Sequence, residues 1–189
     1  MQLTRAIGST ILLFTALGVL WIANSVAQTT EPPEGVTVRV DFTYQNFSSK
    51  ITLYRVPEDA VLWRTRSVPT LADASVTSPL ASNELQLLPG DRQRFALVMH
   101  NTTRETLYFF AAPHVMTPEE NTLGLKFLCL CINQAFQVKP GHVWYRVVEL
   151  QVDEAHQGRT LRATHRIIGL DEERGQYFSN PLNRMKRRG

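Results

Sequence analysis

The most hydrophobic stretch of the chain lies near its N-terminus, where residues 6–23 carry no charged side chain. A run of this length can span a bilayer as a helix. Arg5 precedes it and the first charges after it are acidic, so the positive-inside rule predicts a cytoplasmic N-terminus and a periplasmic (or equivalent) C-terminal domain. The small residues that end at Ala27 are also typical of a signal-peptide cleavage site. A retained single-pass inner-membrane anchor and a cleaved leader therefore both stay open for residues 1–27.

From residue 36 onward, the pattern changes to the alternation of apolar and polar residues that is typical of half-buried β-strands. The strand-like segments are residues 36–42, 50–56, 84–101, 107–112, 135–152 and 160–168. The third and the fifth each contain a Pro-Gly turn, so each predicts a short strand, a turn and a longer strand. Short strands at this spacing predict an all-β fold, an immunoglobulin-like antiparallel β-sandwich. No amphipathic helix is expected after the N-terminal segment.

These patterns divide the chain into four parts. After the anchor or signal peptide, residues 28–35 form a polar linker with two prolines. Residues 36–170 form the sandwich domain, within which residues 66–83 are rich in Ser, Thr, Ala and Pro and predict a long loop. Residues 171–189 form a basic C-terminal tail.

Composition and charge narrow the range of possible function classes. The hydrophobic fraction of 43% is that of a globular protein, and the net charge of +3 comes largely from residues 184–188. So small a basic cluster, outside the cytoplasm, does not indicate nucleic-acid binding. No Ser/His/Asp set, catalytic carboxylate pair or phosphate-binding glycine loop stands out, so we expect a protein that is not an enzyme.

The two cysteines of the chain lie one residue apart, in Lys126-Phe127-Leu128-Cys129-Leu130-Cys131-Ile132. The surrounding residues favour a strand, in which residues i and i+2 share a face about 6.6 Å apart. This spacing is at the upper limit for a disulfide. Thiolates select soft metals. Two sulfurs are too few for a closed zinc or iron–sulfur site, which usually takes four protein ligands, whereas Cu(I) accepts low coordination numbers. We therefore expect Cys129 and Cys131 to bind Cu(I), with packed core thiols or a disulfide as the alternatives.

The five histidines are scattered, without the regular spacing of a metal motif. His114 and Met116 lie two residues apart and would share one face of an extended segment. They are the candidate auxiliary ligands, and a structural role is the alternative for each.

Between Asn101 and Gly141 the chain resembles the CtaG-type cytochrome c oxidase assembly proteins. That family has the signature Lys-Ile-x-Cys-Phe-Cys-Phe, followed by a Gln and a Pro-Gly turn. The chain has Lys126-Phe127-Leu128-Cys129-Leu130-Cys131-Ile132, then Gln134 and Pro140-Gly141. The segment His114-Val115-Met116-Thr117-Pro118 resembles the family's Asn-x-Thr-Pro. The chain departs from the family at Leu130, where the family has Phe, and in lacking a cysteine soon after the anchor.

The resemblance implies a membrane-anchored copper chaperone with an immunoglobulin-like domain outside the membrane. Its client would be the CuB site of cytochrome c oxidase subunit I or another membrane copper enzyme. It would also need a copper donor and a thiol reductant, and a homodimer could pool four sulfurs around two copper ions. Two alternatives stay open: a non-metal β-sandwich module that scaffolds assembly of a membrane complex, and a periplasmic thiol oxidoreductase.

Overall fold

The computed structural model describes residues 35–156 and 160–180. The predicted anchor at residues 1–27, most of the predicted linker and the basic residues 184–188 lie outside the described residues. Within the described part of the chain, no helix is both long and apolar enough to cross a membrane.

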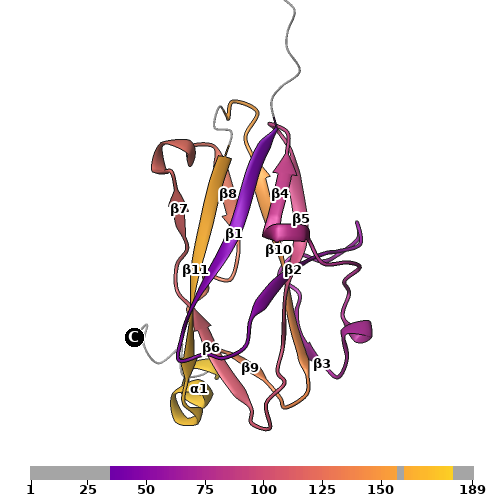
Figure 1. The fold of residues 1–189 in the computed structure, drawn as a ribbon, viewed down its shortest axis with the longest axis vertical. Coiled ribbons are helices and arrows are strands. Elements are labelled where there is room, and N and C mark those ends of the chain that lie inside the picture. The colour runs from indigo at the N-terminus through magenta and orange to yellow at the C-terminus, as the bar shows by residue number, and fades with distance from the viewer. Residues whose placement is uncertain (1–34, 157–159, 181–189) are drawn as a thin grey trace, which may run out of the picture. The chain divides into compact units, whose positions relative to one another are not determined.

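The described residues fold mainly as β-sheet, in two sheets that enclose a common core, which confirms the expectation of an all-β sandwich (Figure 1). The first sheet consists of β4 (Glu84–Leu87), β1 (Val36–Gln45), β11 (Thr160–Leu170), β6 (Leu107–Ala111) and β9 (Phe136–Val138), with β7 (Val115–Thr117) also paired to β11. The second consists of β2 (Ile51–Arg55), β5 (Arg92–His100), β10 (Val143–Val152) and β3 (Thr65–Val68), with β8 (Leu125–Leu128) also paired to β10.

One strand pair departs from the predicted antiparallel arrangement. β1 and β11 run parallel, with Val38 opposite Leu161 and Val40 opposite Ala163. An antiparallel pair can be closed by a short hairpin, whereas a parallel pair needs a long connection. Because β1 and β11 are the first and last strands of the domain, no hairpin fixes their direction, and the strand pattern alone did not reveal it.

Alternation along the strands builds the core between the sheets. Val36, Val38 and Val40 of β1 point inward, as do Leu161 and Ala163 of β11. β10 differs because nearly all of its residues are buried. Its outer face is covered by the segment before β4.

The segment predicted as a long loop, residues 66–83, is more structured than expected. It begins within β3 and contains two short 3₁₀ helices, Leu71–Asp73 and Ala81–Asn83. Ala74 of this segment packs with Tyr145 and Val147 of β10. The segment therefore helps to bury the outer face of β10, which explains why that strand is buried on both sides.

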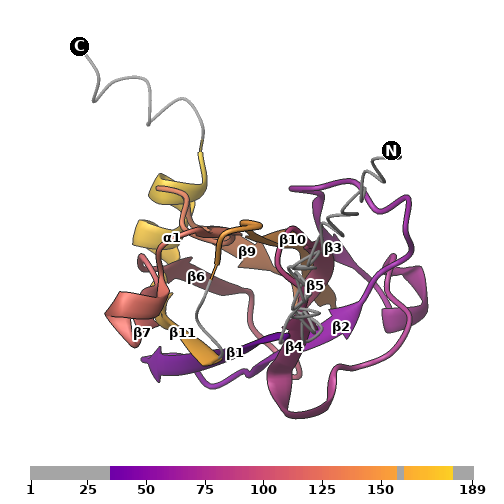
Figure 2. The same cartoon turned by 90° about the horizontal axis from the view of Figure 1, so that it is seen from above.

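A helix, α1 (Glu172–Ser179), lies within the region predicted as a basic C-terminal tail, to which the sequence pattern assigned no helix. The carboxylate of Asp171 accepts a hydrogen bond from the Arg174 backbone N–H and caps its N-terminus. α1 contacts β6 and β9 (Figure 2). Its buried residue is Gly175, at which a Cβ would collide with the Tyr108 ring of β6. The helix thus packs through a glycine rather than an apolar stripe, and this removed the periodic signal that predicts a helix.

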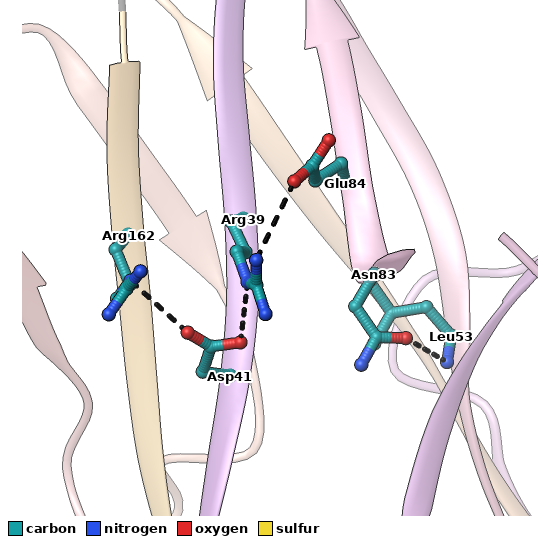
Figure 3. A network of polar contacts seen from close by, with 6 residues as sticks. All are labelled: Arg39, Asp41, Leu53, Asn83, Glu84 and Arg162. Carbon is teal, nitrogen blue, oxygen red and sulfur yellow. Dashed lines mark hydrogen bonds and ion pairs between the residues drawn. The ribbon is translucent and has the colours of Figure 1, made fainter. Parts of the chain in front are cut away.

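Charged side chains form a chain of ion pairs across β4, β1 and β11 of the first sheet (Figure 3). Asp41 of β1 bonds Arg39 at 2.9 Å and Arg162 of β11 at 3.2 Å, and Arg39 lies 3.9 Å from Glu84 of β4. Asp41 thereby pairs with both of two arginines that the strand register sets opposite each other. Exposed pairs of this kind contribute little stability, so their effect is mainly on register. In the same view, the Asn83 side chain accepts a hydrogen bond from the Leu53 backbone N–H at 3.3 Å, which ties the start of β4 to β2.

Candidate metal centre

Four side chains from three separate parts of the chain converge between the two sheets. His165 lies on β11 of the first sheet and His114 lies between β6 and β7 of the same sheet, whereas Cys129 and Cys131 follow β8 of the second. One ligand atom from each residue lies within 4.8 Å of the others. The cluster therefore bridges the sandwich at the edge where β7 and β8 are the outer strands.

The cysteines lie in a bend rather than in the strand that the sequence predicted. β8 ends at Leu128, whose partner on β10 is Glu149. Beyond this point the chain leaves β10 and crosses to β9 in the first sheet, so it cannot continue as a paired strand. Leu130 is fully buried between the two cysteines, and its carbonyl accepts a hydrogen bond from the Ile132 N–H at 2.6 Å, the i to i+2 pattern of a γ-turn.

The bend still brings the two thiols together, as the spacing predicted. The two Sγ atoms lie 2.8 Å apart, and the Cys131 backbone N–H donates to the Cys129 sulfur at 3.4 Å. A disulfide bond measures about 2.05 Å, so both residues are free thiols. Cys129 is buried and Cys131 is exposed.

His165 is the ligand that sequence reasoning missed. On β11, alternation points Leu161, Ala163 and Ile167 into the core, and His165 occupies an inward position in the same series, with no exposed surface. Within the described part of the chain, neither of its ring nitrogens has a hydrogen-bond partner. A buried polar group left unsatisfied is unfavourable, and a metal ion bound at this ring would satisfy it.

Aromatic rings enclose this imidazole. The Phe42 ring stacks on it with centroids 5.7 Å apart, and Phe127 of β8 meets it edge-on at 5.4 Å. These contacts fix the ring plane on two sides. The histidine signal could have been found by asking which histidine occurs at an inward position of a strand.

A β-bulge turns His114 toward the site. Ala111 lies opposite Ile167 and Val115 opposite Thr164, so residues 112–114 face a stretch that takes only residues 165–166 on β11. The extra residue shifts the alternation of side chains by one position, so that residues after the bulge point to the opposite face from the one expected without it. Ala111 points inward before it, whereas Val115 is 62% exposed after it.

With this reversal, His114 lies across from His165, with ring centroids 5.2 Å apart. Its Nδ1 is 3.1 Å from each of the two Sγ atoms. Met116, the second predicted auxiliary residue, is half-buried and packs against the hydrophobic core. A ligand role for Met116 stays a prediction.

Comparison with known protein families finds a match over most of the described domain. Residues 36–170 match the family described as a domain of unknown function, DUF8709. The chain belongs to the DUF8709 family. No curated protein matches it. The description of the DUF8709 family states no function.

The two thiols of the DUF8709 domain differ in acidity. The hydrogen bond from the Cys129 thiol lowers the pKa of Cys131, against the effect of burial, and the His114 and His165 rings lower it further. The same thiol–thiol bond raises the pKa of Cys129, as does burial of that sulfur. The pair therefore shares a proton, with the negative charge on the exposed Cys131, where an incoming cation would meet it first.

Two sulfurs and two imidazole nitrogens form a ligand set that suits soft and borderline cations. Four such donors can complete a tetrahedral Zn(II) site, and sulfur-rich sites also select Cu(I). The protein therefore has enough ligands for zinc, contrary to the expectation from its two cysteines alone, because His114 and His165 supply two more. The geometry is compatible with metal binding.

Proposed function

We propose that this protein is a membrane-anchored copper chaperone. Cys129 and Cys131 bind Cu(I) as thiolates, with His114 and His165 as further ligands. The observation that carries the proposal is the convergence of these four side chains, brought from two sheets to within 4.8 Å of one another. Four soft or borderline donors rarely gather by chance in a protein interior, where polar groups are ordinarily hydrogen-bonded.

The gradient of burial across the site suits release of the ion. Cys129 and His165 are buried, His114 is half-buried and Cys131 is exposed. An incoming ligand from a client can replace Cys131 first, while the buried ligands still hold the ion. Cu(I) keeps its oxidation state in such an exchange, and only the coordinating atoms change.

Three further features complete the proposal. The domain is an immunoglobulin-like sandwich, an interpretation supported by its two sheets and by the pairing of the first strand with the last. Residues 1–27 hold it in the inner membrane with the domain on the periplasmic side, which the uncharged stretch at residues 6–23 supports. The favoured client is the CuB site of cytochrome c oxidase subunit I, on the strength of the Cys-x-Cys resemblance alone, with other membrane copper enzymes as alternatives.

A structural Zn(II) site is the second candidate, favoured by the full set of four ligands. The metal would then join the two sheets, and the domain would act as an interaction module that scaffolds assembly of a membrane complex. Structural zinc sites are closed and contribute directly to folding. The exposed sulfur of Cys131 favours the chaperone over this alternative.

Metal titration of the full-length reduced protein tests the proposal. With a Cu(I)-specific competing chelator and no oxygen, we expect about one Cu(I) per chain. Cys129→Ser and Cys131→Ser should each abolish tight binding, whereas His100→Ala, at an exposed histidine outside the cluster, should leave it unchanged. Undiminished Cu(I) affinity in the double serine variant would refute the copper site.

A cellular measurement tests delivery. A strain carrying Cys131→Ser should hold the folded protein at normal abundance and contain a membrane oxidase that lacks copper. A copper-replete oxidase in that strain would refute the chaperone role and favour the interaction module.

A further inference from the structure

A buried arginine without a counter-charge lies on the inner face of the second sheet. Arg146 of β10 is 6% exposed, and it alternates with Trp144 and Val148, which both belong to the core between the sheets. No carboxylate among the described residues forms an ion pair with it. A buried charge is unfavourable unless other groups compensate it, so a carboxylate from a bound partner would stabilise this position.

The guanidinium of Arg146 has one side free for such a carboxylate. Its Nη1 donates a hydrogen bond to the hydroxyl of Thr65, which lies opposite it on β3. Nε is buried without a partner, and Nη2 makes no hydrogen bond within the described part of the chain. Nε and Nη2 lie on the same side of a guanidinium and together can bind both oxygens of one carboxylate. The unpartnered nitrogens of Arg146 therefore form a fork that fits a carboxylate.

An exposed tryptophan covers this guanidinium. The Trp63 ring centroid lies 4.9 Å from the guanidinium carbon, and Trp63 is 41% exposed. Its backbone is left-handed, with φ of 69°, a strained conformation for a residue other than glycine and one that clusters at ligand-binding sites. Val61, two residues before it, is 51% exposed. Trp63 and Val61 thus supply an apolar rim beside the buried charge, and movement of the Trp63 ring would open the fork to a partner.

The strand next to Arg146 has an open edge. β3 pairs with β10 on one side, and no other strand among the described residues pairs with it. An open edge can take up an extended peptide through its backbone N–H and C=O groups. Residues 60–72, which include β3, contain Arg64 and Arg66 and no acidic residue. The charge of this edge is therefore complementary to that of an acidic segment.

We propose that the edge of β3 is a docking site for an acidic, extended segment of a partner protein, one carboxylate of which binds Arg146. The segment adds to β3 as a further strand, and its apolar side chains contact Val61 and Trp63. An anionic lipid surface would meet the same positive charges, but it could not pair with the backbone of β3. The inference goes beyond copper delivery, because it needs no metal at the cysteines.

Peptide binding to the full-length reduced protein tests the docking site. The probe is a fluorescein-labelled eight-residue peptide of alternating glutamate and valine, followed by fluorescence anisotropy at fixed ionic strength. A peptide with glutamine in place of glutamate should bind at least tenfold more weakly. Arg146→Gln should weaken binding of the acidic peptide about tenfold or more, and Arg146→Lys severalfold, because lysine keeps the charge and lacks the fork. Arg166→Gln, at an exposed arginine of β11, removes the same charge elsewhere and should leave the affinity within about twofold.

A second variant keeps the arginine in place, in case the domain does not fold without it. Thr65→Asp puts a carboxylate beside the guanidinium and should weaken binding of the acidic peptide about tenfold, because the charge of Arg146 is then balanced within the chain. Thr65→Asn is the uncharged control and should bind like the wild-type protein. Circular dichroism of each variant shows whether the β-sheet signal is retained.

Three results would overturn the docking site. The first is equal affinity for the glutamate and glutamine peptides. The second is unchanged affinity in folded Thr65→Asp or folded Arg146→Gln. The third is Arg146-dependent binding of glycerol phosphate without binding of the acidic peptide, which would assign the edge to a lipid surface. Each result would leave the proposed copper site standing, since that site is tested separately by Cu(I) titration of the cysteine variants.

Discussion

Replacing His165 by leucine tests whether this imidazole is present for metal binding rather than for folding. In the metal-free protein, both ring nitrogens of His165 are buried without a hydrogen-bond partner. An unsatisfied buried polar group costs about 1–3 kcal/mol. Leucine has a similar volume and no polar atom, so it removes that cost and creates little cavity. We therefore expect His165→Leu to stabilise the metal-free protein by about 1–3 kcal/mol.

The assay is denaturant unfolding of the full-length reduced protein in the presence of a chelator. A domain of this size should also gain about 3 °C in melting temperature for each kcal/mol. The denaturant dependence should keep its slope, because the surface exposed on unfolding hardly changes. His100→Leu is the matched control: His100 is exposed and its ring lies 3.2 Å from the Gly141 carbonyl oxygen, so no gain is expected there.

With metal bound, the wild-type protein should become more stable than His165→Leu. Wild-type protein at a free metal concentration 100 times the dissociation constant should gain about 2.7 kcal/mol, and His165→Leu should gain much less. If the leucine variant instead unfolds more easily than wild type without metal, by the 2–5 kcal/mol typical of a damaged core, then His165 is a structural residue and the reasoning fails.

The remaining predictions concern the thiols and the elements that position them. Cys131→Ser should change the free energy of unfolding by less than about 0.5 kcal/mol because the side chain is exposed. Cys129→Ser should lower the free energy of unfolding by about 1–3 kcal/mol because it buries a hydroxyl. Equal effects of the two substitutions in denaturant unfolding would contradict this difference. Since the pKa of Cys131 is lowered, its alkylation by iodoacetamide should persist as the pH falls below the usual thiol range near 8.5. An alkylation rate that falls with pH as it does for an ordinary free thiol would exclude the shared proton. Deleting Pro113 removes the extra residue of the bulge, turns His114 outward and should weaken metal binding without unfolding the domain, as circular dichroism and titration would show. Gly175→Ala collides with a tyrosine ring on β6 and should lower stability by about 1–3 kcal/mol, with metal affinity unchanged; a parallel loss of metal binding would mean that α1 supports the site.

The class of fold and the presence of the thiol pair could both be predicted from local features of the chain. Alternation in segments such as residues 36–42 and 160–168 is a local property, because successive side chains of a strand point to opposite faces. The two sheets follow from it. The proximity of Cys129 and Cys131 is also local, since two residues separated by one cannot move far apart. Their common side was predicted correctly, although the strand assigned to them was not.

Tertiary structure decided the rest, because the remaining features depend on partners that are distant in the chain. β8 ends at Leu128 only because the chain must cross to the other sheet. The parallel direction of β1 depends on β11, the last strand. His114 faces the site only because the stretch between β6 and β7 that carries it holds one more residue than the stretch opposite on β11. His165 becomes a candidate ligand only when β11 sets it beside cysteines from the other sheet. A strand pattern indicates which side chains share a face. The strand register and the crossing of the chain between the sheets decide which faces meet. The candidate metal centre lies where two such faces meet.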